Sequence, residues 1–264
     1  MISSIALFAT SLISPFFVEV TPEFRSSYIS LGKLMEDRPM LVVGSNVGYD
    51  SGSFGRFGVR NREISSLTDR RSDVHRHACY HSEFGPMWQY DIDIADGWKL
   101  TSDFSKAWTI YRGFKGASAS SDRTYHWWQI DQALVNPYLT PFWRMREYVH
   151  GNEYFYFKLG VRRRFPILEG LSVTPSTFVE GGSSRCIVRV VGDKPGGGEW
   201  RGNMSTLSFR LELNWSVSES VSLFAYAEQY MVVGSSHRDA NGDNPYRCAH
   251  NDWTMGGFGA RLKF

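Results

Sequence analysis

The chain has 264 residues, of which 42% are hydrophobic and 21% charged, and this composition excludes both a disordered and a collagen-like protein. Its formal net charge of +2 provides no basic field, so we expect no nucleic-acid partner. No window contains the roughly 18 consecutive apolar residues of a spanning helix, which excludes a helical membrane protein. Aromatic residues make up 15% of the chain and favour pleated surfaces and membrane-water interfaces over helices.

The first residues, 1–16, form an apolar stretch about as long as a signal-peptide core. No Lys or Arg precedes this core and no clear cleavage motif follows it, so a residual signal and a lead-in to a first strand both stay open. We therefore expect a lead-in over residues 1–16 and one domain over residues 17–264.

Alternation with period two is the clearest pattern that follows, and it places alternate side chains on opposite faces of a strand. In residues 206–217 every second residue is apolar, from Leu207 to Val217, while the residues between them are polar. Residues 88–94, 153–165 and 251–264 alternate in the same way. These segments are predicted to be strands, each with one apolar and one polar face.

Short turns and long polar connections separate the strands in turn. Asp96-Gly97, Glu169-Gly170 and residues 218–220 have the composition of tight turns, and long polar stretches lie at 62–83, 113–122, 192–203 and 234–251. The expected strands are 17–30, 39–50, 54–61, 84–95, 98–112, 123–133, 141–150, 154–165, 171–190, 204–217, 221–233 and 252–264. Twelve strands bring both chain ends to the short-turn rim. Because the connections 31–38 and 150–153 are short for the long-loop rim, a count differing by two stays open.

The direction in which the apolar faces point decides between two fold classes. A soluble β-sandwich or lipocalin-like barrel also alternates, with its apolar face inside. Charged residues on successive polar faces, strands of ten residues or more, and aromatic residues near strand ends favour lipid outside and water inside. The prediction is an all-β, antiparallel, up-and-down transmembrane β-barrel of about twelve strands.

The last nine residues, GGFGARLKF, resemble the C-terminal signal of Gram-negative outer-membrane barrels. The matching positions are the terminal aromatic Phe264, the apolar Leu262 and the glycine Gly259; the family pattern prefers an aromatic residue at position 262 and a polar one at 257. The resemblance implies a location in the bacterial outer membrane, with membrane lipid and the barrel-assembly machinery as partners. It assigns no subfamily.

Enzymes on this architecture, outer-membrane phospholipases and lipid A deacylases, carry an H-x-S motif, and this sequence contains none. His81 and Ser82 are adjacent, so an extended backbone points their side chains to opposite faces and makes a proton relay awkward. We therefore expect no enzyme activity.

Four metal-capable residues alternate in the segment VHRHACYH: His75, His77, Cys79 and His81. Their spacing matches no tetrahedral zinc pattern, and a polar external loop is the favoured interpretation, so no metal and no other cofactor is expected. Cys79 and Cys248 both lie in expected long connections, where a disulfide and free thiols both stay open.

A basic ladder is the main candidate site. It consists of Arg144, Arg146, Lys158, Arg162 and Arg164. The acidic residues expected to face it across the lumen are Asp91, Asp93, Glu180 and Glu212. Such an arrangement would concentrate anions in a pore. In the alternative, the charges pair with one another and fill a narrow barrel.

The leading functional hypothesis is a passive channel, or porin, for small and preferably anionic solutes. A plugged structural or adhesive barrel that acts through its long external loops is the first alternative, and a membrane-embedded lipid hydrolase is the second. The sequence leaves the solute and the oligomeric state open.

Overall fold

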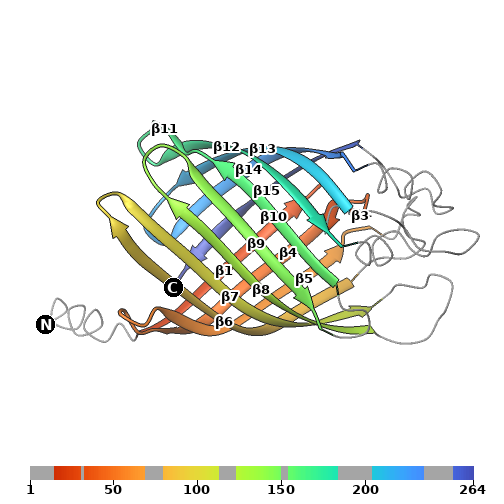
Figure 1. The fold of residues 1–264 in the computed structure, drawn as a ribbon, viewed down its shortest axis with the longest axis horizontal. Helices are drawn as coiled ribbons and strands as arrows, with labels where there is room; N and C mark the ends of the chain where they lie inside the picture. The colour runs from red at the N-terminus through yellow and green to blue at the C-terminus, as the bar shows by residue number, and fades with distance from the viewer. Residues whose placement is uncertain are drawn as a thin grey trace, which may run out of the picture.

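A computed structural model describes residues 15–30, 33–68, 80–112, 123–149, 154–183, 204–234 and 252–264. Twelve long antiparallel strands form the wall of a closed barrel (Figure 1), as the alternation predicts. They are β1 (Phe16–Arg25), β4 (Met40–Asp50), β5 (Arg56–Ser66), β6 (Tyr80–Ala95), β7 (Trp98–Arg112), β8 (Arg123–Val135), β9 (Thr140–Tyr148), β10 (Tyr154–Arg162), β12 (Leu171–Gly182), β13 (Met204–Ser216), β14 (Val221–Val232) and β15 (Asp252–Lys263).

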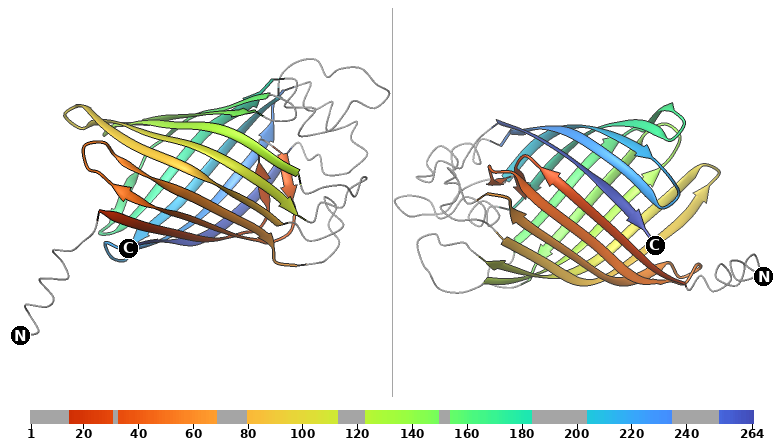
Figure 2. Two further views of the ribbon diagram at one scale, coloured as in Figure 1. Left: turned by 90° about the horizontal axis from the view of Figure 1, so that it is seen from below. Right: turned by 180° about the vertical axis from the view of Figure 1, so that it is seen from behind.

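Three short strands accompany the wall. β11 (Phe165–Leu168) extends the sheet beside β12, while β2 (Tyr28–Ser30) and β3 (Lys33–Glu36) form a separate hairpin between β1 and β4. Successive long strands pair as a meander, and the ring closes through the pairing of β1 with β15. All strands are tilted against the barrel axis (Figure 2), as closure requires.

The two rims differ as expected. At one rim Gly97 and Gly170 adopt φ angles of 71° and 73°, which suit tight turns and are unfavourable for other residues. The start of β1 and the end of β15 meet at this same rim, where Val18 and Phe264 exchange two backbone hydrogen bonds of 3.0 and 2.8 Å. Even strand parity is thereby confirmed.

Some expected boundaries are wrong at the long-loop rim. Residues 62–66 and 80–83 belong to β5 and β6, although they were assigned to a polar connection. The pattern inverts there, because Ile64 points inward and packs with Tyr28, Met40 and Val42, whereas Glu63 points outward. In addition, β1 ends at Arg25 rather than residue 30, and β12 ends at Gly182 rather than residue 190.

The outer surface of the wall is apolar and the inner surface is charged. On β13, Phe209, Leu211 and Trp215 are about half exposed, at 49%, 55% and 52%, while Arg210 and Glu212 line the interior. This is the side-chain arrangement of a transmembrane barrel. Within the described residues, no helix is long and apolar enough to cross a membrane.

Side chains fill the lumen in the half of the barrel nearer the long loops. Each of the twelve wall strands contributes an inward side chain that is at most 9% exposed. We call this set the packed layer: Glu23, Val42, Ile64, Glu83, Thr109, Trp127, Arg146, Tyr156, Glu180, Thr206, Tyr230 and Met255. Many of its members are charged or hydroxylated, so the layer is polar and is not an aliphatic core.

Candidate functional site

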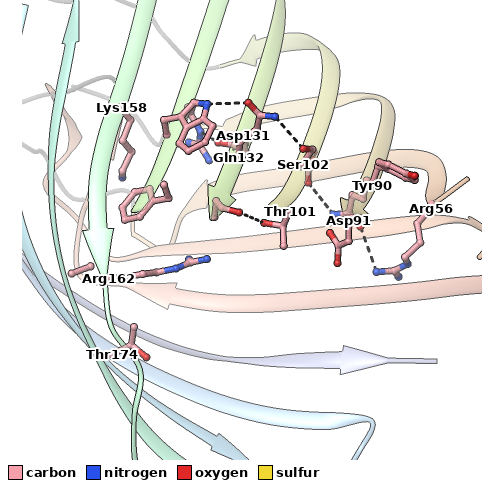
Figure 3. Close-up of a pocket in the computed structure, with 18 of the residues that line it drawn as sticks. Arg56, Tyr90, Asp91, Thr101, Ser102, Asp131, Gln132, Lys158, Arg162 and Thr174 are labelled. Atoms are coloured by element: carbon pink, nitrogen blue, oxygen red, sulfur yellow. Dashed lines mark hydrogen bonds and ion pairs between the residues drawn. The ribbon is translucent and has the colours of Figure 1, made fainter. Parts of the chain in front are cut away.

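A cavity of about 850 Å³ occupies the lumen between the packed layer and the short-turn rim. Arginine, lysine, aspartate and glutamate side chains from most of the wall strands line it. Figure 3 shows Lys158, Arg162 and Thr174 on one side of this space, with Arg56 and Asp91 on the other. The described part of the lumen is therefore a polar cup that opens toward the short turns.

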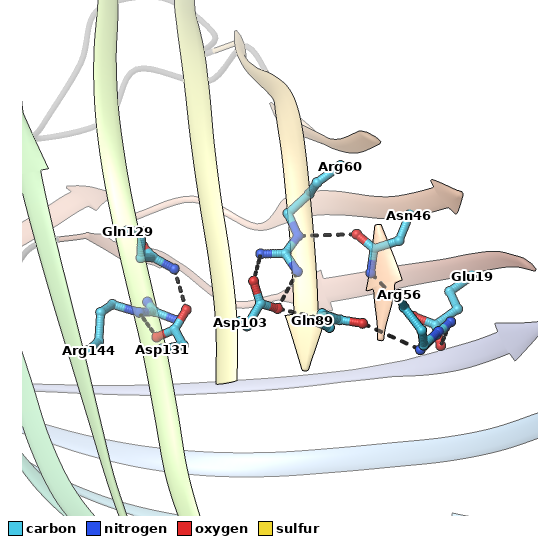
Figure 4. Close-up of polar contacts among 9 residues, drawn as sticks. All are labelled: Glu19, Asn46, Arg56, Arg60, Gln89, Asp103, Gln129, Asp131 and Arg144. Atoms are coloured by element: carbon cyan, nitrogen blue, oxygen red, sulfur yellow. Dashed lines mark hydrogen bonds and ion pairs between the residues drawn. The ribbon is translucent and has the colours of Figure 1, made fainter. Parts of the chain in front are cut away.

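A continuous row of polar side chains winds around the inside of the wall. Seven residues are joined in sequence by cross-strand register, and we call them the lumenal belt: Arg56, Gln89, Asp103, Asp131, Arg144, Lys158 and Glu180. Because the strands are tilted, this row rises obliquely from the short-turn rim to the packed layer. Figure 4 shows part of the belt and its hydrogen-bonded neighbours.

Ion pairs neutralise most of the belt. Arg144 binds the carboxylate of Asp131, and Lys158 Nζ lies 3.0 Å from Glu180 Oε1. Arg144 and Lys158 are direct cross-strand neighbours, so each like charge is compensated by an acid on its far side. Glu180 is thus a neighbour of the basic ladder and does not face it across the lumen.

Arg162 differs from Arg144 and Lys158 because it has no acidic cross-strand neighbour. Its cross-strand neighbours are the hydroxyl residues Thr140 and Ser176, and its guanidinium lies 5.5 Å from the ring centroid of Phe142. Within the described residues, no carboxylate lies within 4.0 Å of it, because Glu180 pairs with Lys158 and Glu212 pairs with other arginines. Arg162 consequently lines the cavity without a direct ion pair in this part of the chain.

The remaining ladder residues lie at different heights. Arg146 is buried in the packed layer, where it donates to Gln129 Oε1 at 2.7 Å and to the Tyr148 hydroxyl at 2.9 Å. Arg164 lies beyond the end of β10, near the short turns, and donates to Ser172 Oγ at 2.9 Å. The five basic residues therefore share one wall, but they do not form a single constriction.

The acidic candidates also separate. Asp91 lines the cavity, whereas Asp93 lies at the short-turn rim with 83% of its side chain exposed, 3.8 Å from Lys99 Nζ. Glu212 lines the cavity and binds Arg210 and Arg261. Asp91 and Glu212 therefore line the same cavity as Arg162, whereas Asp93 does not; Glu212, two strands from β10, does not face the ladder across the lumen.

The three residues of the C-terminal pattern lie on β15 and at its end. Gly259 faces the lumen so close to β1 that a Cβ atom there would come within 2.4 Å of the Pro22 carbonyl oxygen. Leu262 pairs with Val20 and Val221, and the Phe264 side chain is 77% exposed. A terminal aromatic ring with so few contacts within the barrel remains accessible to another protein.

His81 lies inside the barrel, with Nε2 3.1 Å from Glu83 Oε1. Ser82 points outward and donates to Glu63 Oε1 at 2.7 Å, so the adjacent pair occupies opposite faces. The other residues of the alternating segment, His75, His77 and Cys79, lie outside the described residues, as does Cys248. Across the described ranges, no three metal-capable side chains cluster.

Sequence reasoning missed several lumenal charges. Arg60 donates twice to Asp103, at 3.2 and 2.6 Å, and Arg56 Nη2 lies 3.0 Å from Glu19 Oε1. The spacing of Arg56, Arg60 and Arg62 at even positions of β5 was an available signal. Asp103 gave none, because polar residues at positions 102, 103, 105 and 106 conceal the alternation there.

Solved structures provide the available comparisons. No protein-family model and no curated relative matches the chain. The KdgM porin is 10% identical over 94% of this chain and 99% of its own, with a TM-score of 0.47. The β domain of the Bordetella autotransporter BrkA is 14% identical over 94% of this chain and 98% of its own, with a TM-score of 0.46. The translocator domain of the autotransporter NalP from Neisseria meningitidis is 11% identical over 100% of this chain and 95% of its own, with a TM-score of 0.45. The chain itself forms a closed antiparallel barrel of twelve strands, and these similarities assign it to no subfamily.

Proposed function

We propose that this chain is a narrow outer-membrane channel for small anionic solutes. The observation that supports the proposal best is the guanidinium of Arg162, which lines a cavity of about 850 Å³ without a direct ion pair among the described residues. The other basic residues that line this cavity are held in ion pairs or contact acids, so they fill the lumen without attracting further anions. A cation on the wall of a confined pore raises the local concentration of anions.

The wall around Arg162 suits an organic anion rather than a hydrated inorganic ion. Phe142 and Phe178 lie beside it, with ring centroids 6.3 Å apart, and offer apolar surface next to the cation. Thr174 and Ser176 add hydroxyl groups on the neighbouring strand. Aromatic surface beside a few polar groups is the usual composition of a small-molecule site.

Planar-bilayer recording tests this proposal with a matched pair of variants. Arg162→Glu is expected to lower the anion-to-cation permeability ratio about twofold or more, because it reverses a cavity-lining charge that has no direct ion pair among the described residues. Arg163→Glu is the control, since Arg163 is exposed and its guanidinium lies 4.8 Å from the Phe165 ring rather than in the cavity. Silence of the wild type at all voltages, or equal selectivity of the two variants, would contradict the channel.

The packed layer favours a second candidate, a barrel that is closed and acts through its long loops. Inward side chains from all twelve wall strands are at most 9% exposed there, which supports an occluded lumen. If this candidate is correct, shortening the connections 113–122 and 235–251 will abolish surface binding while ion permeability stays unchanged. Loss of permeability without loss of binding would favour the channel.

We also propose that the barrel has no lipid-hydrolase activity. His81 and Ser82 point to opposite sides of the wall, and each binds a different carboxylate, which supports this view. A lipid-release assay on the wild type and on His81→Ala is the test. Release that disappears in the variant would establish the enzyme instead.

A further inference from the structure

Lys106 lies on the outer face of the barrel, beside two tryptophan side chains. It pairs in register with Trp128 of β8, whose side chain is 51% exposed on the outside. Its neighbours on β7, Ser105 and Ala107, are buried and point inward. A lysine is therefore present on the surface that faces lipid in a transmembrane barrel.

Two indole rings hold this ammonium group. Lys106 Nζ lies 5.0 Å from the ring centroid of Trp108 and 4.8 Å from that of Trp128. Trp108 is itself fixed, stacked on Phe84 at 5.6 Å and in edge contact with His126 at 6.0 Å. We call Lys106, Trp108 and Trp128 the indole clamp.

The clamp lacks a carboxylate partner within the described part of the chain. No Asp or Glu oxygen of those residues lies within 4.0 Å of Lys106 Nζ. On the outer face, Glu147 pairs in register with Trp128 and not with Lys106, and Glu63 accepts a hydrogen bond from Ser82. Cation–π contacts offset only part of the penalty for placing an ammonium group in lipid, so an anion from outside the chain would stabilise Lys106 further.

We propose that the indole clamp binds the phosphate of a phosphorylated glycolipid headgroup in the leaflet on the long-loop side. Lys106 lies in the half of β7 (Trp98–Arg112) that is farther from the short turn, and long loops face the outside in single-chain outer-membrane barrels. A lysine ammonium binds phosphate as a point charge, and tryptophan rings favour the headgroup level. This site rests on membrane insertion and is independent of any solute passing through the lumen.

Binding of lipid A, its dephosphorylated form and phosphatidylglycerol to the refolded barrel in phosphatidylcholine vesicles tests the proposal, with tryptophan fluorescence as the readout. We expect wild type to prefer lipid A, Lys106→Gln to lose about tenfold in affinity, and Lys106→Arg to retain most of it. Lys99→Gln is the matched control, because Lys99 lies on the same strand but contacts Asp91 and Asp93 at the rim.

Equal binding of lipid A by wild type and a folded Lys106→Gln variant would overturn the site. So would equal wild-type affinity for phosphorylated and dephosphorylated lipid A, a comparison that decides the matter even if the variant does not fold. A stronger response to phosphatidylglycerol than to lipid A would refute the glycolipid as the occupant.

Discussion

Arginine at position 211 provides a graded test of membrane insertion. Leu211 lies near the centre of β13, and its side chain is 55% exposed on the outer face. An arginine facing lipid at mid-depth destabilises a barrel by about 2–4 kcal/mol, but by only about 0–1 kcal/mol near an interface. Val217, 51% exposed and adjacent to the turn after β13, supplies the interfacial comparison. Leu211→Arg should therefore shift the folding equilibrium roughly 30- to 900-fold, and Val217→Arg at most about fivefold.

Urea titration of the barrel in phosphatidylcholine vesicles measures both effects, with the heat-dependent gel shift reporting the folded fraction. If the outer face of this barrel met water instead of lipid, both positions would lie on an ordinary protein surface, and substitutions there would change stability by only about 0.5 kcal/mol or less. Equal destabilisation at positions 211 and 217, or none at either, would refute the proposed depth of β13 in lipid.

Three further predictions concern the packed layer, the turn at Gly170 and assembly of the barrel. Arg146→Ala should raise single-channel conductance in planar bilayers, because it removes a buried side chain from the packed layer, and unchanged conductance would show that the layer does not limit flow. Gly170→Ala should cost about 1–2 kcal/mol in urea titration, since φ is 73° and a Cβ would lie 2.7 Å from the Ser216 carbonyl oxygen; wild-type stability would argue against this turn. Phe264→Ser should lower the yield of assembled barrel in a Gram-negative host but not spontaneous refolding, and an equal loss in both would indicate a purely structural role.

Strand prediction succeeded where the two faces of the wall differ uniformly in polarity. β13 alternates without exception from Leu207 to Ser216, and its boundaries were predicted to within one residue. β7 was located correctly although Ser102 and Lys106 interrupt its apolar face, because its turn at Gly97 and the following polar connection delimit it. Near the long loops the rule fails, because the lumen there holds apolar side chains such as Ile64 and the outside holds Glu63.

The candidate site was only partly predictable, because lumenal contacts depend on register between strands. Alternation places Arg144, Lys158 and Arg162 on inward faces, and the structure brings them to one wall. The alternation pattern alone does not predict that Lys158 lies directly beside Glu180. Nor does it predict that the cross-strand neighbours of Arg162 are hydroxyl residues. A one-residue change of register between two strands would move the side chains of one strand to the opposite face of the wall and remove these contacts. The register between two strands cannot be inferred from the sequence of either strand alone.

Site-directed spin labelling along β13 tests the central claim most directly. Single nitroxides at positions 207–214, in a background without Cys79, Cys186 and Cys248, report contact with lipid-soluble oxygen in vesicles. Outward apolar faces predict oxygen maxima at Leu207, Phe209, Leu211 and Leu213 and minima at the positions between them. Maxima at the polar positions, or an accessibility that does not alternate, would contradict a barrel with lipid outside and charge within.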